Sequence, residues 1–165
     1  HGRDVPPLAG GAHLEATAGV LQQQGEQAVV GVLGHPPVPG AVVRALGPSV
    51  AGILGTDHDL VRRVIRSGEN HGEPFWELPL VEEYKESLRT PYGDLNNIAA
   101  GGLAGAITAG LFLREFVANG AAWAHLDIAG PMFKDKEWKY FDAGAIGFGV
   151  KTLVDLCERF RDPLA

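Results

Sequence analysis

The sequence contains a single cysteine, Cys157, among 165 residues. One cysteine cannot form an internal disulfide, so folding does not require an oxidising compartment and a cytoplasmic location is expected. No apolar run approaches the roughly 18–20 residues that cross a bilayer. The first residues also lack the basic segment followed by an apolar one that typifies a secretory signal. We therefore expect no membrane partner.

Positive charge is scarce as well. The 14 Lys and Arg residues against 20 Asp and Glu residues leave a net charge of −6. A surface that neutralises phosphates needs a basic excess, so nucleic acid is not an expected partner. The chain also lacks the complete catalytic signatures HExxH, CxxC, the phosphate-binding P-loop and GxSxG. No self-contained catalytic site is therefore evident from motifs alone.

Aromatic residues are missing from the first part of the chain, since all thirteen lie from Phe75 onward. Residues 1–50 instead hold nine Gly, six Pro and only five charged residues. Such a composition favours neither a strong core nor a solvated face, so we expect this stretch to be the least ordered. We expect residues 1–39 to be disordered or aberrant in sequence and residues 40–165 to form the folded part.

Clearer signals of secondary structure begin near residue 41. The short apolar runs 41–46 and 50–54, split by a Gly-Pro pair, predict two strands or one strand and a turn. Thr56 precedes an acidic residue three positions later and predicts a helix start, with the helix ending at Gly68. Residues 80–88 predict a second, short helix. The loops and alternating elements indicate an α/β chain.

The second half contains the more apolar elements. Residues 106–117 predict a helix buried on most sides, because its polar strip is narrow. Residues 123–128 predict a buried strand, and Val150, Leu153, Val154, Cys157 and Phe160 recur at helical spacing in a last helix. The order helix, buried strand, helix supports an α/β fold.

Two features offer local chemistry. His125 and Asp127 share one face of the predicted strand, because side chains alternate along a strand, and they offer two ligands for a metal ion without a third nearby. The glycine-rich segment 144–149 precedes the last helix and is suited either to an anion at the helix N-terminus or to tight packing of the helix on the sheet. Solvated or structural roles explain the remaining histidines and acidic clusters.

Several longer segments resemble a known family. They are Glu77–Leu80, Asp94–Ile98, Gly105–Phe116, Trp123–Gly130 and Gly147–Val150, preceded by Ala45–Gly52. Together these segments are similar to the C-terminal part of the leucyl aminopeptidases, also called cytosol aminopeptidases. The resemblance covers about three quarters of the chain.

The resemblance implies a three-layer α/β/α sandwich around a mixed sheet, of which this chain is an incomplete, C-terminal portion. It further implies a homohexamer that hydrolyses peptides with a water activated by two divalent ions of manganese, zinc or magnesium. The family's metal ligands lie in a Lys/Asp segment and an Asn-Thr-Asp-Ala-Glu-Gly-Arg signature upstream of the matched segments. This chain contains neither, so the resemblance assigns it no catalytic residue, no metal ligand and no bound metal of its own.

What the resemblance assigns to this chain is the wall of a substrate pocket. Gly40 matches a glycine whose backbone lies beside the substrate, and Ile98 matches a residue on the leaving-group side. Ala129 and Met132 match the floor of the pocket for the N-terminal side chain. A small Ala and a flexible Met admit an apolar side chain of leucine size.

The sequence differs from the family's pattern at the N-terminal end of the matched region. Pro37-Val38-Pro39-Gly40 takes the place of the family's Thr-Leu-Thr-Gly, and prolines remove backbone donors from the preceding segment. Residues 1–39 match poorly. The sequence therefore predicts the C-terminal part of a metalloaminopeptidase that is inactive by itself. A non-catalytic subunit for assembly or binding, and a separate enzyme with metal at His125 and Asp127, remain alternatives.

Overall fold

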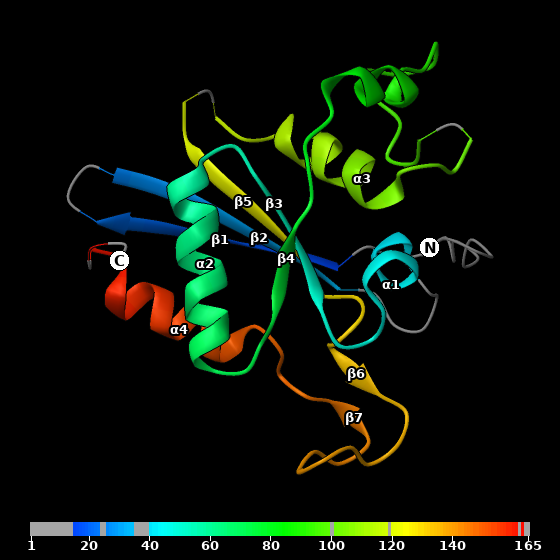
Figure 1. The fold of residues 1–165 in the computed structure, drawn as a ribbon. Coiled ribbons are helices and arrows are strands. Elements are labelled where there is room, and N and C mark those ends of the chain that lie inside the picture. The colour runs from blue at the N-terminus through cyan, green and yellow to red at the C-terminus, as the bar shows by residue number, and fades with distance from the viewer. Residues whose placement is uncertain are drawn as a thin grey trace, which may run out of the picture.

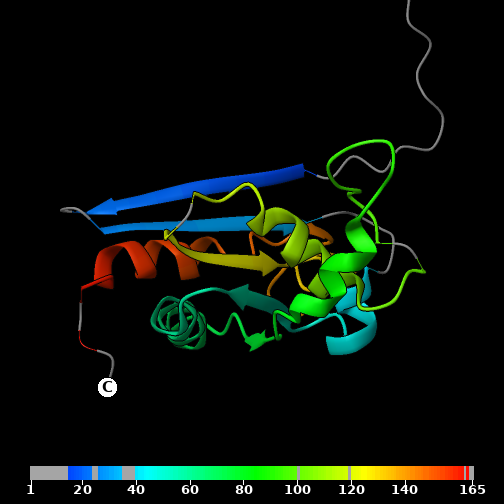
Figure 2. The same ribbon diagram turned by 90° about the horizontal axis from the view of Figure 1, so that it is seen from above.

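A computed structural model describes residues 15–23, 26–34, 40–99, 101–118, 120–161 and 163. Its centre is a sheet of five strands in the order β1-β2-β5-β3-β4 (Figure 1). Seen from above, the strands follow one another in that order (Figure 2). The strands are β1 Glu15–Gln23, β2 Glu26–Gly34, β3 Ala51–Gly55, β4 Phe75–Glu77 and β5 Ala122–Asp127.

The sheet is mixed, and β5 is its central strand. β1 and β2 form an antiparallel hairpin, and β2 runs parallel to β5 with Gly31 opposite His125. On its other edge β5 pairs antiparallel with β3, which pairs in parallel with β4. A strand with neighbours on both edges and helices on its faces is expected to be mainly apolar, and β5 is so except at His125 and Asp127.

One face of the sheet is covered by α2 His58–Asn70 and α4 Val150–Arg159, which lie to the left of β3 and β4 in Figure 1. Alternate strand residues turn toward these helices, as the strand pleat requires. The main hydrophobic core forms there. It includes Ile53, Leu60, Val64, Phe75, Leu126 and Leu156.

The opposite face carries α1 Ala41–Leu46, the 3₁₀ helix η1 Glu82–Leu88 and α3 Gly105–Arg114, with α1 and α3 to the right of the same strands in Figure 1. A Cβ at Gly110 of α3 would lie 3.0 Å from the Leu54 side chain, so the helix packs closely on β3. Two layers of helices therefore enclose the sheet. The predicted α/β/α architecture around a mixed sheet is confirmed.

Several predicted elements need correction. Residues 41–46 are helix α1 and not a strand, while the strand expected at 50–54 is present as β3. A six-residue apolar run has too few residues to distinguish a period of two from one of 3.6. The strand expected at 123–128 is β5, which begins one residue earlier.

The start and end of α2 also differ from expectation. The N-cap is Asp57 and not Thr56, because the Asp57 carboxylate accepts a hydrogen bond from the Leu60 backbone N–H at 2.8 Å. Gly68 does not end the helix, which continues to Asn70. A Cβ at Gly68 would come within 2.4 Å of the Glu73 backbone oxygen. Gly68 therefore serves close packing of the chain as it leaves the helix.

Helix α3 is shorter than the predicted 106–117, although all of its residues are buried or partly buried, as expected. α3 ends at Arg114, and the Phe116 side chain beyond it is 72% exposed. In α4 the buried residues are Thr152, Asp155 and Leu156, whereas Val150 and Val154 are exposed. The buried face of α4 is thus partly polar because it meets polar groups of α2, which the apolar spacing alone did not indicate. No described helix has the length and hydropathy needed to span a membrane.

A small two-stranded ribbon, β6 Phe133–Lys134 and β7 Gly144–Ala145, projects from the end of β5 (Figure 1). β1 and β2 fall within the segment 1–39 that the sequence analysis separates from residues 40–165. That division stays a prediction. Residues 35–39, with the prolines that replace the family's strand end, lie outside the described residues.

Glu73 joins α4 to the turn that follows α2. Its carboxylate is buried and accepts hydrogen bonds from the Thr152 backbone N–H at 3.0 Å and from the Thr152 hydroxyl at 2.5 Å. Thr152 lies in the first turn of α4, where backbone N–H groups lack helical partners. The anion at the N-terminus of α4 is therefore the protein's own Glu73. An anion at this helix N-terminus was one of the two roles that the glycine-rich segment 144–149 suggested.

Replacing Glu73 with alanine is expected to lower the free energy of unfolding by about 2–3 kcal/mol. The change removes a charged acceptor and leaves two buried donors of Thr152 unpaired. Urea unfolding followed by circular dichroism measures the effect. Glu69→Gln, an exposed change on α2, is the matched control and should stay within about 0.5 kcal/mol of the unchanged protein. Equal stabilities of the two variants would contradict this role of Glu73.

Candidate functional site

Three segments meet where β5 ends. They are Gly40 at the N-terminus of α1, the turn Ala129–Gly130 after β5, and the loop Gly47–Val50 before β3. A Cβ at Gly40 would lie 3.6 Å from the Ala129 Cβ, and a Cβ at Gly130 would lie 2.6 Å from the Gly47 backbone oxygen. The lack of a side chain at Gly130 lets the turn after β5 lie directly against the loop before β3. Two of the four predicted pocket residues, Gly40 and Ala129, are neighbours.

Asp127 orients the turn that carries Ala129. Its Oδ1 accepts a hydrogen bond from the Ala129 backbone N–H at 3.3 Å. The Asp127 side chain lies on the α1 side of the sheet, since a Cβ at Gly52 would meet both it and Val42 of α1. Burial raises the pKa of Asp127 to about 6, and the hydrogen bond from Ala129 opposes this rise.

The other two predicted pocket residues are placed differently. Met132 is partly buried and packs against the main core, and its backbone N–H donates to the Ile128 oxygen at 3.1 Å. Ile98 lies in the loop between η1 and α3, where its side chain is 72% exposed. Its placement in a separate loop leaves Ile98 available to a ligand. The assignment of all four residues to a substrate pocket stays a prediction.

His125 lies on the same sheet face as Asp127, as the strand alternation predicts. Its ring stacks on Trp123 at a centroid distance of 6.3 Å and is fully buried. Neither ring nitrogen has a hydrogen-bond partner among the described residues. Burial lowers the pKa of His125 to about 4, and the backbone of Gly31 on β2 offsets this only in part. The ring is therefore neutral at pH 7, and sequence reasoning had no signal for its lack of partners.

His125 and Asp127 do not make a metal centre by themselves. Within the described ranges no group of three or more His, Cys, Asp and Glu side chains is arranged to hold a metal ion. Two ligands from one strand leave a divalent cation short of the usual four or more. The described residues therefore do not fit the two-metal centre of the resembled family, and we derive no chemical step through metal ions from them.

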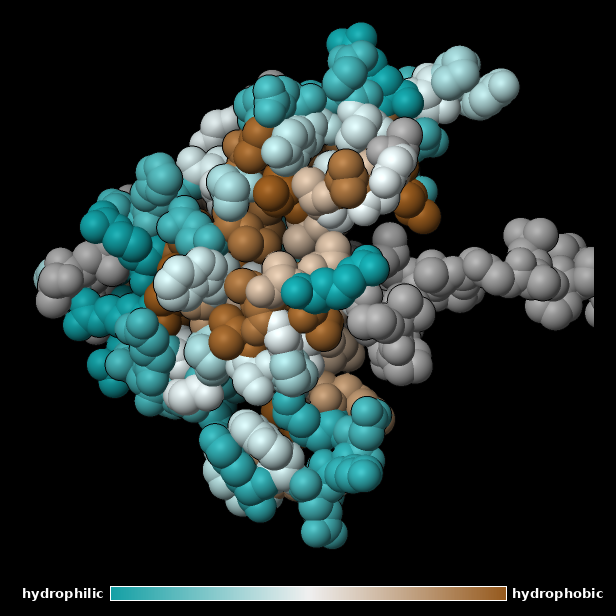
Figure 3. Space-filling view, turned by 45° about the vertical axis from the view of Figure 1, so that its right-hand side comes forward, coloured by the Kyte–Doolittle hydropathy of each residue, from teal (hydrophilic) through white to brown (hydrophobic). Residues whose placement is uncertain are grey.

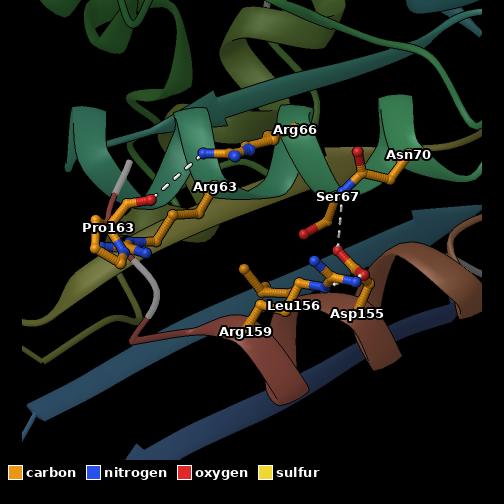
Figure 4. Close-up of a pocket in the computed structure, with 8 residues that line it drawn as sticks. All are labelled: Arg63, Arg66, Ser67, Asn70, Asp155, Leu156, Arg159 and Pro163. Carbon is orange, nitrogen blue, oxygen red and sulfur yellow. Dashed lines mark hydrogen bonds and ion pairs between the residues drawn. The ribbon is translucent and has the colours of Figure 1, made fainter. Parts of the chain in front are cut away.

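A cluster of ionisable side chains occupies the contact between α2 and α4 (Figure 4). Around a small cavity of about 50 Å³, the buried Asp155 carboxylate lies 2.9 Å from Arg159 Nε, 3.4 Å from His71 Nε2 and 3.5 Å from Asn70 Nδ2. Burial opposes ionisation of Asp155, but hydrogen bonds from Ser67, His71 and Asn70 and the charge of Arg159 lower its pKa. A carboxylate with this many donors holds the two helices together and is a poor general base.

Apolar side chains gather across the middle of one face of the molecule, bordered by hydrophilic ones (Figure 3). Several large apolar residues on the chain as a whole are strongly exposed. They include Trp76, Tyr92, Ile98, Leu103, Phe116 and Tyr140. Exposed apolar groups of this size are typical of surfaces that contact other protein.

The sequence of this chain is similar to a known protein family. Residues 23–154 match the cytosol aminopeptidase family, catalytic domain. The chain belongs to this family. The predicted resemblance is thereby confirmed, and the family is one of peptidases.

The similarity is strong in sequence. A probable cytosol aminopeptidase of Synechococcus elongatus is 46% identical over 118 residues, which are 70% of this chain and 24% of that protein. The neutral, chloroplastic leucine aminopeptidase of tomato, Solanum lycopersicum, is 39% identical over 142 residues, which are 86% of this chain and 23% of that protein. This family member thus spans about a quarter of the length of the curated relatives that it matches.

Solved structures of similar proteins have the same fold as this chain. A mutant of tomato leucine aminopeptidase superposes with a TM-score of 0.70 at 39% identity, covering 80% of this chain and 24% of that chain. The bottromycin maturation enzyme BotP superposes with a TM-score of 0.74 at 33% identity, covering 81% and 29%. The family fold therefore accounts for most of this chain.

Asp127→Asn is expected to make stability depend more steeply on pH. Folding lowers the pKa of His125 from 6.5 to about 4, so between these pH values the unfolded state binds more protons at this residue than the folded state does. His125 therefore makes the folded state more stable as the pH rises from 4 to 6.5. Asp127, whose pKa is raised from 3.8 to about 6, removes stability as pH rises through that window. The two effects oppose each other in the unchanged protein.

Urea unfolding at pH 4 and pH 7 tests this balance. The gain in unfolding free energy from pH 4 to pH 7 should be about 1–3 kcal/mol larger in Asp127→Asn than in the unchanged chain. Asp135→Asn, a change at an exposed aspartate, is the control and should leave the pH dependence as it was. The same pH dependence in Asp127→Asn and the unchanged chain would contradict the buried setting of Asp127.

Proposed function

We propose that this chain is the C-terminal part of the catalytic domain of a leucyl-type aminopeptidase, which releases the N-terminal residue of a peptide. The observation that carries the proposal is the match of residues 23–154 to the catalytic domain of this family. The role assigned to the chain is to form part of the pocket that holds the substrate. The bond is broken by groups that the rest of the protein supplies.

The geometry at the end of β5 supports this role. Gly40 and Ala129 present backbone and a single methyl group to each other across a short gap. A peptide main chain can approach such a surface closely, and the small Ala129 leaves room for an apolar side chain. Met132 adds a flexible apolar wall, and exposed Ile98 contacts the residues after the scissile bond. Asp127 holds the Ala129 backbone in place through its hydrogen bond.

The complete protein is proposed to bind two divalent ions of manganese, zinc or magnesium. Such ions make a hydroxide nucleophile at neutral pH and polarise the scissile carbonyl. Residues of this chain contribute by shaping the cavity beside that centre and by excluding water from it. The chain alone is proposed to be inactive.

Assembly into a homohexamer is part of the same proposal. It is supported by family membership and by the strongly exposed apolar side chains, which include Leu103 and Phe116. A cytoplasmic location is proposed from the relatives named cytosol aminopeptidase. The tomato relative is named as chloroplastic, so a fluorescent fusion of the complete protein is the direct check.

Activity should require more protein than this chain. The product of the complete reading frame is expected to hydrolyse leucine p-nitroanilide with added Mn²⁺, and to lose that activity with a chelator. The 165-residue chain should show no turnover under the same conditions. Turnover by the isolated chain would contradict the placement of the catalytic groups. An inactive but assembled complete protein would favour a non-catalytic assembly subunit instead.

Ala129→Leu in the complete protein is expected to narrow the side-chain pocket. It should lower kcat/KM about 10–100-fold for a leucine substrate and less for an alanine substrate, because the added branch occupies the space of the substrate side chain. Steady-state kinetics with both p-nitroanilides measures the change. Ala143→Leu, at an exposed position of the β6–β7 segment, is the matched control. An unchanged leucine-to-alanine preference in Ala129→Leu would refute the assignment.

A further inference from the structure

A second, larger cavity borders the turn after β5 and the loop before β3, because Pro131 and Ser49 line it. It has a volume of about 330 Å³ and lies between the turn His71–Pro74 after α2, the β6–β7 segment and the first turn of α4. Its lining includes none of the four predicted pocket residues. A volume of this size falls at the lower end of the range for small-molecule sites.

Aromatic rings form much of the cavity wall. Trp138, Tyr140, Phe141 and Phe148 all line it. Trp138 and Phe141 exchange two backbone hydrogen bonds of 3.0 Å. Their ring planes are nearly parallel, and the ring centroids are 6.4 Å apart. Phe148 is buried and contacts Phe75 of the main core, with 5.3 Å between ring centroids. The wall is thus largely aromatic, and Phe148 attaches it to the main core.

Positive charge surrounds these rings. Lys134, Lys139 and Lys151 line the cavity, and none of them forms an ion pair with an acidic side chain in the described part of the chain. The ammonium groups of Lys134 and Lys139 lie 4.9 Å and 4.3 Å from the centre of the Trp138 ring. Lys139 and Lys151 are exposed and Lys134 is partly buried, so this cavity gathers positive charge in a chain whose net charge is −6.

Lys134 is fixed at the cavity by a hydrogen bond to the loop before β3. Its Nζ donates to the Pro48 backbone oxygen at 2.7 Å, and its partial burial lowers its pKa. Burying an ammonium without a counter-ion costs free energy, which a bound anion would offset.

The acidic and titratable neighbours do not supply that anion. Glu73 lines the cavity, but its carboxylate is engaged by Thr152 at the start of α4. His71 also lines the cavity and lies 3.4 Å from Asp155. Asp135, Glu137 and Asp142 of the β6–β7 segment are exposed and are not among the lining residues. The cavity therefore has an excess of positive charge beside a largely aromatic wall.

We propose that this cavity binds a small organic anion that carries an aromatic ring. The lysines pair with the anionic group, and the ring packs against Trp138 and its neighbours. An aromatic carboxylate and an aromatic phosphate share this chemistry. None of the four residues predicted for the substrate pocket lines this site, and the proposal does not depend on the proposed peptidase activity.

Trp138 provides an internal reporter for binding. In a fluorescence titration of the chain, 3-phenylpropionate and phenyl phosphate test the carboxylate and the phosphate. The amide 3-phenylpropanamide has the ring without the charge, and acetate has the charge without the ring. Saturable binding is expected for at least one of the aromatic anions, at least about tenfold tighter than for the amide or acetate. Whichever anion binds more tightly identifies the head group.

Lysine variants test the assigned partners. Lys151→Gln and Lys139→Gln are expected to weaken binding of the preferred anion about fivefold or more, because each removes one ammonium group. Lys136→Gln is the matched control, since Lys136 is exposed in the same segment and is not a lining residue. Calorimetric titration of the complete protein with the same variants repeats the test in the full assembly.

Three results would overturn the proposal. The first is an absence of saturable binding of both aromatic anions up to about 10 mM, since a weaker site has no specific recognition. The second is equal affinity for the propionate and its amide. The third is an equal effect of the Lys151 and Lys136 variants.

Discussion

The structure depends on the central position of β5 between β2 and β3. This strand is paired on both edges, packs Ala124, Leu126 and Ile128 into the main core and presents Trp123, His125 and Asp127 to the opposite face. The end of β5 at Asp127 determines the position of the segments to which we assign a function. The Ala129–Gly130 turn, the neighbouring Gly40 and the β6–β7 segment are all placed by the exit of the chain from β5.

Glycines make that exit possible. At Gly130 a side chain would overlap the Gly47 backbone oxygen, and at Gly68 of α2 one would overlap the Glu73 backbone oxygen, so glycine permits close packing of the backbone at both points. Close packing of backbone on backbone gives a rigid support, and a rigid support is what a substrate pocket requires. The polar contacts between α2 and α4, through Glu73 and Asp155, secure the other side of the sheet in the same way. Burial of these charges is tolerated because each one has several donors.

The surface at Gly40 and Ala129 and the cavity beside Trp138 differ in their chemistry. The surface at Gly40 and Ala129 is small, apolar and close to backbone, which suits a peptide. The cavity beside Trp138 combines lysines with aromatic rings, which suits an anion with a ring. A family defined by its catalytic domain can thus carry a second recognition surface in a segment that does not take part in hydrolysis.

The ordered motifs from Glu77 to Val150 were enough to assign the family and the layered α/β class, because long apolar strands and glycine spacing are local properties of a sequence. Strand β5 was predicted almost to the residue for that reason. Helix α1 was not, since a six-residue apolar run reads equally well as strand, and only packing on β3 and α3 decided between them. The polar face of α4, the capping of its first turn by Glu73 and the gathering of three lysines around Trp138 join residues from distant segments. Contacts of that kind exist only once the chain has folded, so tertiary structure alone determined them.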